Sequence, residues 1–88
     1  MPEYRVRFAP PADRQLRKLP RDMQKRVASV IDGLALDPRP PGVERLAGNR
    51  DLWRIRVGVY RVSYAIEDDR LVVLIVKVGP RRDVYRVL

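Results

Sequence analysis

The hydrophobic residues of this chain change their period twice, and this change restricts the fold more than any other feature. Residues 3–8 alternate between apolar and charged side chains, which is typical of a half-buried strand. Apolar residues then recur at helical spacing through residues 12–34, and the period returns to two from residue 53 onward. Strand-like blocks on both sides of a helical block indicate an α+β fold.

Prolines divide the helical block in two. Pro10 and Pro11 follow the first strand and suit the first turn of a helix. Pro20 interrupts the pattern and can begin a second helix, which Asp37-Pro38 ends. The second helix carries an amphipathic stripe formed by Met23, Val27, Val30, Ile31 and Leu34. We therefore expect an antiparallel helix hairpin with one shared apolar face.

Three further strands follow residues 37–49, a proline- and glycine-rich stretch predicted to be a loop. Residues 53–57 and 60–66 alternate on either side of a turn at Gly58, and residues 67–70 form a polar hairpin turn. Residues 71–78 are almost entirely apolar, as in a central strand covered on both faces, and Gly79-Pro80 is predicted to break this strand. The predicted fold is β-α-α-β-β-β: an N-terminal strand, a two-helix hairpin packed on one face of the sheet, and a three-stranded antiparallel meander. The sequence leaves open where the N-terminal strand joins the sheet.

The length and composition suit one small domain, residues 1–88. Hydrophobic residues make up 45% of the chain, enough for a single core. The chain has no cysteine, so disulfides and thiolate metal ligands are excluded, and we expect neither a metal nor another cofactor. The N-terminus does not resemble a signal peptide, and the longest apolar run, residues 71–76, is too short to cross a bilayer. We expect a cytoplasmic protein.

The charge of the chain points to a polyanionic partner. The formal net charge is +8, and the only lysines are Lys18, Lys25 and Lys77, so arginine supplies most of the positive charge. Arginine binds phosphates in a bidentate manner and stacks on bases. A general bias toward arginine explains the Arg:Lys ratio equally well, but the net charge itself favours nucleic acid. A membrane partner is disfavoured, because no segment combines a strongly apolar face with a basic one.

Three arginines are predicted to share one face of the sheet. Arg54 and Arg56 are two residues apart on one strand, and Arg61 follows the turn on the next strand. Like charges on adjacent strands are unfavourable, and no acidic residue lies between residues 53 and 65, so this face is predicted to bind an anion. The alternative is a solvated outer face on which the arginine stems cover apolar surface.

The aromatic residues separate into two groups. Trp53, Tyr60 and Tyr64 share the alternation of the apolar residues and are interpreted as core or rim rather than as base-stacking groups. Tyr85 lies in the basic tail, residues 81–88, outside any apolar pattern. For Tyr85, simple packing and a functional role fit equally well.

Residues 53–62 (WRIRVGVYRV), followed by residues 78–85 (VGPRRDVY), resemble the signature of the RelE/ParE toxin superfamily. Leu19-Pro20, Asp37-Pro38-Arg39 and Leu46-Ala47-Gly48 also match the usual rhythm of that superfamily, so the resemblance covers nearly the whole chain. It implies a toxin of a type II toxin–antitoxin system. The RelE branch implies a ribosome-dependent endoribonuclease, or mRNA interferase, which cleaves mRNA in the ribosomal A site and so inhibits translation.

The resemblance also implies roles for individual residues. In the RelE branch, a 2′-hydroxyl of the message attacks the adjacent phosphate, and basic residues at the positions of Arg54, Arg56 and Arg61 surround that phosphate. Arg81 matches the residue proposed to protonate the leaving oxygen, and Tyr85 matches a tyrosine that stacks on or positions a base. The predicted catalytic set is Arg54, Arg56, Arg61, Arg81 and Tyr85, and the predicted nucleic-acid-binding set is Arg54, Arg56, Arg61, Arg81, Arg82 and Arg86.

The sequence leaves the general base open. The best-described member of the family carries lysines at the positions of Arg54 and Arg56, and Pro80 stands where many relatives carry histidine or lysine. Arginine stays protonated in proteins, and this chain has no histidine. Either the cations supply most of the rate, or the ribosome supplies the missing function.

Two further functions fit the same features. A ParE-like toxin would inhibit DNA gyrase without catalysis, although that branch generally lacks the complete basic set found here. A nucleic-acid-binding protein without catalysis is the other reading. The resemblance implies a RelB-like antitoxin as partner, and an acidic chain would complement the charge of +8. The other implied partners are the ribosome and mRNA, and operator DNA through the antitoxin complex.

Overall fold

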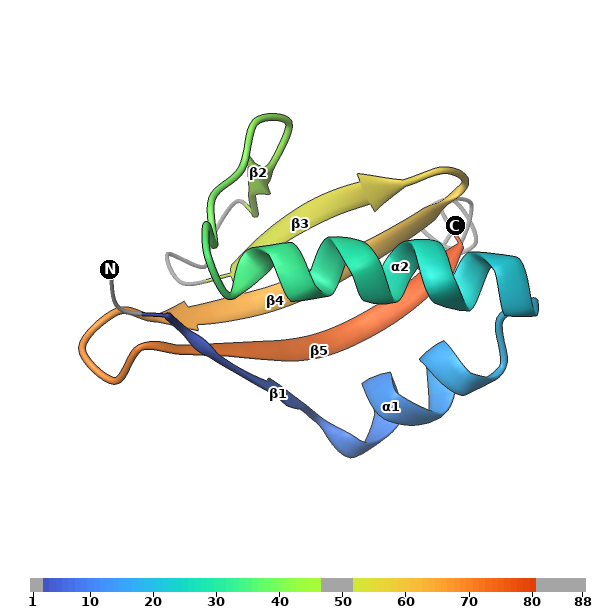
Figure 1. The fold of residues 1–88 in the computed structure, drawn as a ribbon, viewed down its shortest axis with the longest axis horizontal. Coiled ribbons are helices and arrows are strands. Elements are labelled where there is room, and N and C mark those ends of the chain that lie inside the picture. The colour runs from blue at the N-terminus through green and yellow to red at the C-terminus, as the bar shows by residue number, and fades with distance from the viewer. Residues whose placement is uncertain (1–2, 47–51, 81–88) are drawn as a thin grey trace.

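A five-stranded mixed sheet carries two helices on one of its faces (Figure 1). The structure, a computed structural model, describes residues 3–46 and 52–80. The elements in chain order are β1 (Arg5–Phe8), α1 (Pro10–Arg17), α2 (Arg21–Leu34), β2 (Glu44–Arg45), β3 (Leu52–Val57), β4 (Tyr60–Glu67) and β5 (Val72–Pro80). The strand order in the sheet is β1-β5-β4-β3-β2. The predicted α+β architecture, with its helix hairpin and antiparallel meander, is confirmed.

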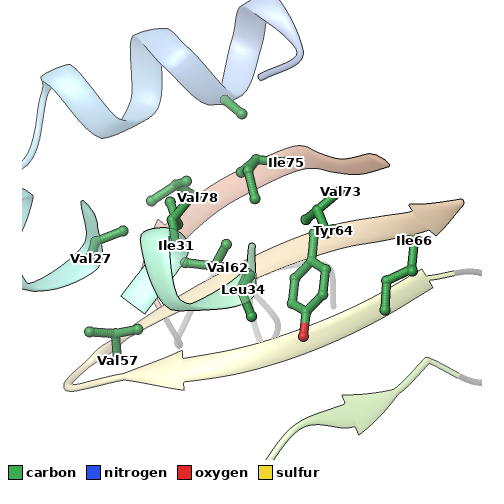
Figure 2. Packing of buried hydrophobic residues seen from close by; sticks show 11 residues of the cluster. Val27, Ile31, Leu34, Val57, Val62, Tyr64, Ile66, Val73, Ile75 and Val78 are labelled. Carbon is green, nitrogen blue, oxygen red and sulfur yellow. The ribbon is translucent and has the colours of Figure 1, made fainter. Parts of the chain in front are cut away.

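The helices begin where the prolines indicate. Pro10 is the first residue of α1, and Pro20 is the N-cap of α2. A missing backbone N–H costs nothing at these positions, because the first N–H groups of a helix have no partner within the helix. The stripe of α2 packs against the sheet, with Val27, Ile31 and Leu34 buried in the core. Figure 2 shows these side chains together with core residues of β3, β4 and β5.

The N-terminal strand takes the position that the sequence left open. β1 pairs with β5, and the two strands are parallel, with Arg5 beside Val72 and Phe8 beside Ile75. The backbone N–H of Arg5 also donates to the carbonyl of Leu71 at 2.7 Å. β5 is therefore an interior strand of the sheet, flanked by β1 and β4. The predicted cover on both faces of this strand is not complete, since Leu74 and Val76 are only half-buried.

Two sequence predictions are wrong in detail. The stretch read as a loop contains β2, whose two residues pair with β3. Gly79-Pro80 does not break the last strand, because β5 continues through both residues, opposite Arg61 and Tyr60. The N–H of Val78 donates to the side chain of Gln15 at 2.8 Å, away from β4. Backbone N–H groups two residues apart point to the same edge of a strand, so an N–H at position 80 would also point away from β4. Proline at this position therefore removes no hydrogen bond between β5 and β4.

The hairpin between β3 and β4 depends on Gly58. Gly58 and Val59 form a two-residue turn between the paired residues Val57 and Tyr60. Gly58 has a φ of 61°, in the left-handed region that favours glycine. Glycine at the first position of the turn is the pattern of a type II′ hairpin, whose twist matches that of the strands. This turn fixes the register of the arginines on either side.

No helix within residues 3–46 and 52–80 is long and apolar enough to cross a membrane.

Candidate nucleic-acid interface

The predicted arginines lie together on the face of the sheet opposite the helices. Arg54 and Arg56 alternate along β3 with Ile55 and Val57, which contribute to the core, and Arg61 precedes the buried Val62 on β4. Successive side chains of a strand point to opposite faces, so the three guanidinium groups project away from α1 and α2. We call this side of the sheet the arginine face, formed by Arg54, Arg56, Arg61 and Lys77.

Arg56 and Arg61 are direct cross-strand partners. They form the second pair from the turn at Gly58. The second pair from a two-residue turn is of the non-hydrogen-bonded type, in which the Cα atoms are about 4.5 Å apart and the side chains are closest. Within the described residues, no carboxylate lies within 4.0 Å of either guanidinium. The pair therefore concentrates positive charge on this face, with Arg56 exposed and Arg61 half-buried.

Arg54 has different surroundings from the other two arginines. It pairs with Ser63 on one side and with Glu44 on the other. Its Nη2 atom is 3.3 Å from the Glu44 carboxylate, and its side chain is 23% exposed. Its Nε atom is buried and has no hydrogen-bond partner among the described residues. Arg54 is thus held against the sheet, whereas Arg56 is exposed.

Sequence reasoning missed two charged residues of this face. Lys77 on β5 is exposed and lies opposite Ser63. Glu44 lies opposite Arg54, in the stretch that was read as a loop. A row of side chains thus crosses four strands, in the order Glu44, Arg54, Ser63 and Lys77. The only sequence signal for Lys77 is its single charge within a long apolar run.

The remaining predicted site residues, Arg81, Arg82, Tyr85 and Arg86, lie outside the described residues. Their roles stay predictions.

The described aromatic residues do not contribute to the arginine face. Tyr64 is fully buried, its hydroxyl donates to the carbonyl of Pro38 at 2.8 Å, and burial raises the pKa of Tyr64 to about 12. Trp53 packs against the core, and the guanidinium groups of Arg39 and Arg45 lie 5.0 and 5.8 Å from its ring centre. Tyr60 is half-buried and alternates with Arg61. The prediction that these three are core or rim residues is confirmed.

A separate ion pair ties the loop after α2 to the turn between β4 and β5. Arg39 donates from Nη1 and Nη2 to the two carboxylate oxygens of Asp68, at 3.2 and 2.9 Å, and the hydroxyl of Tyr4 donates to the same carboxylate at 2.6 Å. The hydrogen bond from Arg39, followed by that from Tyr4, lowers the pKa of Asp68 to about 2. Through Tyr4, this cluster also fastens the segment that leads into β1.

Comparisons with known proteins agree with this fold. The model of the family described as ParE toxin of type II toxin–antitoxin system, parDE, matches residues 6–85. Toxin RelG of Mycobacterium tuberculosis is 37% identical over 94% of this chain and 97% of its own length. A chain of the archaeal RelE–RelB complex from Pyrococcus horikoshii OT3 superposes with a TM-score of 0.81, at 33% identity over 90% of this chain and 96% of that one. A chain of the RelBE2 toxin–antitoxin complex from M. tuberculosis gives a TM-score of 0.79, at 31% identity over 90% and 99%.

Proposed function

Because the chain belongs to the RelE/ParE superfamily of type II toxin–antitoxin toxins, we propose that it is a ribosome-dependent endoribonuclease that cleaves mRNA in the A site. The observation that carries this proposal is the pairing of Arg56 with Arg61 directly across the β3–β4 hairpin, with Arg54 on the same face. Such a cluster is unfavourable for the isolated fold and becomes favourable once an anion lies against it. We take residues 1–88 as one toxin domain.

The proposed reaction is attack of a ribose 2′-oxygen on the adjacent phosphate. This attack adds negative charge to the phosphate oxygens, and preorganised cations stabilise that charge most strongly in the transition state. In the proposal, Arg56 and Arg61 hold the reacting phosphate, and Arg54 supports it from the next position along β3. Arg81 protonates the leaving 5′ oxygen, Tyr85 positions a base, and Arg82 and Arg86 bind flanking phosphates. The ribosome contributes by presenting a single codon in a fixed conformation.

A second candidate function is inhibition of DNA gyrase without catalysis. The description of the matching family model, a ParE toxin, favours it. Relatives named RelE or RelG favour the ribonuclease, since they match this chain over most of its length. The arginine face also favours the ribonuclease. Arg56 and Arg61 are paired across β3 and β4, so both guanidinium groups can bind one phosphate, and this arrangement suits an RNA ligand better than the surface of another protein.

The proposed partner in the cell is a RelB-like antitoxin. The superposed structures from P. horikoshii and M. tuberculosis are complexes of a toxin with its antitoxin. An antitoxin with acidic segments would complement the net charge of +8 and mask the arginine face. In this proposal the complex reaches operator DNA through the antitoxin, and the free toxin acts in the cytoplasm, where its ribosomal target is found.

One pair of assays tests the proposed function. Purified protein is incubated with ribosomes that carry a defined message, and primer extension locates new 5′ ends. DNA gyrase supercoiling is measured in parallel at the same protein concentration. The proposal predicts new ends within the A-site codon and unaffected supercoiling. Inhibited supercoiling with an intact message would establish the ParE-like alternative instead.

A further inference from the structure

Two further arginines lie on the same side of the sheet as the arginine face. Arg5 and Arg7 on β1 alternate with Val6, which packs against the core and lies beside the buried Val73 of β5. Successive side chains of a strand point to opposite faces, so Arg5 and Arg7 project away from α1 and α2. We call these two residues the β1 arginines.

The β1 arginines are exposed and carry uncompensated charge. Within the described residues, no carboxylate lies within 4.0 Å of either guanidinium. At the level of Arg5, the acidic residue of the sheet is Glu67, which is two strands or about 10 Å away and contacts Arg70 instead. Since β1 is an edge strand, one role for these charges is to hinder pairing with a second chain.

A track of cations connects the β1 arginines with the arginine face. Arg5 and Arg7 are about 7 Å apart along β1. When the extra residue of the bulge in β5 is discounted, Lys77 is one strand and two positions from Arg7 and, on its other side, one strand and two positions from Arg61. Each of these Cα separations is about 8 Å. The track ends at Arg56, about 20 Å from Arg7, so each step is short enough for one flexible phosphate backbone to follow.

Apolar side chains lie beside this track. The row that begins at Arg7 continues with Leu74, Ala65 and Leu52 on the next three strands, and all three are half-buried. The bases of a single RNA strand pack on apolar surface while its phosphates contact neighbouring cations. An acidic peptide has the charge to match the cations but does not account for the apolar row. RNA is therefore the ligand that this side of the sheet fits best.

We propose that Arg5 and Arg7 form a second RNA-binding subsite, which holds phosphates of nucleotides that flank those at the arginine face. This inference rests on the proposed function. The planar guanidinium of arginine donates two hydrogen bonds to one phosphate, and two guanidinium groups can hold two phosphates of one strand. Contacts with phosphates carry no sequence information, so the affinity of this subsite depends on the length of the RNA rather than on its sequence.

The test uses the purified protein and two single-stranded RNAs, a uridine trimer and a uridine decamer, titrated by fluorescence anisotropy at several salt concentrations. The trimer can occupy the arginine face alone, whereas the decamer can also extend to β1. We expect Arg5→Ala/Arg7→Ala to lower the slope of log affinity against log salt for the decamer by about 1.4, with a loss of affinity of about 10-fold or more. Its affinity for the trimer should stay at the wild-type value.

Two further double variants serve as controls. Arg14→Ala/Arg21→Ala removes the same charge from exposed positions on α1 and α2, on the opposite side of the sheet, and should bind the decamer nearly as the wild type does. Arg5→Lys/Arg7→Lys keeps both charges and should retain the salt slope. All variants should share the wild-type midpoint of urea unfolding, because β1 pairs with β5 through backbone groups.

Several outcomes would overturn the subsite. Equal losses of decamer affinity in the two alanine double variants, or equal losses for trimer and decamer, would show a general effect of charge. Unchanged RNA binding with weaker binding of an oligoglutamate peptide would assign the β1 arginines to an acidic protein, and unchanged binding of both ligands would leave protection of the sheet edge as their role. The proposed function fails separately: wild-type protein that leaves messages on programmed ribosomes intact would contradict the ribonuclease, whereas cleavage without the length-dependent loss overturns the subsite alone.

Discussion

Arg56 and Arg61 lie directly opposite each other across the β3–β4 hairpin, at the second pair from the Gly58 turn. Two guanidinium groups in this arrangement repel each other, and the described residues offer neither of them a carboxylate within 4.0 Å. The fold thus maintains an unfavourable contact at a position that an anion can occupy. Activity and stability are therefore expected to respond in opposite directions when this pair is changed.

Replacing either member of the pair tests this relationship. In Arg56→Ala or Arg61→Ala, cleavage should fall by about 100-fold or more, because one preorganised cation is lost from the transition state. Relief of the like-charge contact should leave the free energy of unfolding unchanged or raise it by about 0.2–1 kcal/mol. Urea denaturation and single-turnover cleavage measure the two quantities. If cleavage and the free energy of unfolding fall together, these arginines act by stabilising the fold rather than by stabilising the transition state.

Gly58→Ala is expected to weaken the hairpin that carries the pair. The φ of 61° is strained for alanine, which costs about 1–2 kcal/mol. The new Cβ would also lie 3.4 Å from the Cε of Met23, in ordinary contact, so conformation rather than a clash causes the effect. Gly33→Ala is the matched control: it is a helical glycine with open space around it, and alanine there should stabilise by up to about 1 kcal/mol. Equal effects of the two substitutions on thermal unfolding would contradict this assignment.

Acid should weaken the cluster of Arg39, Asp68 and Tyr4. The pKa of Asp68 is lowered from 3.8 to about 2, so the stabilisation is complete above pH 4 and is lost as the pH falls toward 2. In Asp68→Asn this part of the pH dependence should disappear. Urea unfolding of both proteins between pH 2 and pH 6 measures it. Parallel pH profiles for the two proteins would show that Asp68 does not carry the effect.

Lys77 is expected to bind a phosphate that flanks the reacting one. Lys77→Ala should weaken ribosome binding and lower the slope of log affinity against log salt by about 0.7–1. Lys25→Ala removes the same charge from an exposed position on α2, an element packed on the opposite face of the sheet, and should leave that slope unchanged. Equal salt slopes for the two variants would show that Lys77 does not bind a phosphate.

The sequence predicted much of the fold because the signals were long or unambiguous. The stripe of Val27, Ile31 and Leu34 and the prolines at both helix starts defined the hairpin. The alternation on both sides of Gly58 placed all three arginines on one face. β2 was not predicted, because two residues are too few to show a period. For the same reason, the position of Glu44 beside Arg54 was not predicted.

Lys77 shows a different limit of sequence reasoning. Counting by twos from the buried Val73 and Ile75 would direct Lys77 into the core. A shift of register between Ser63 and Tyr64 inserts one extra residue in β5, so that Lys77 faces outward and Val78 faces inward. A β-bulge of this kind reverses the alternation of a strand and leaves no mark in its hydrophobic pattern.

The most direct test of the account uses two messages on programmed ribosomes, one entirely RNA and one with a single 2′-deoxynucleotide at the position that is cut. The account predicts cleavage of the RNA message in the A-site codon and an intact deoxy-substituted position, with equal binding of the toxin to both ribosome complexes. An RNA message that stays intact, or a deoxy-substituted position that is cut at the same rate, would contradict attack by a 2′-hydroxyl at the arginine face.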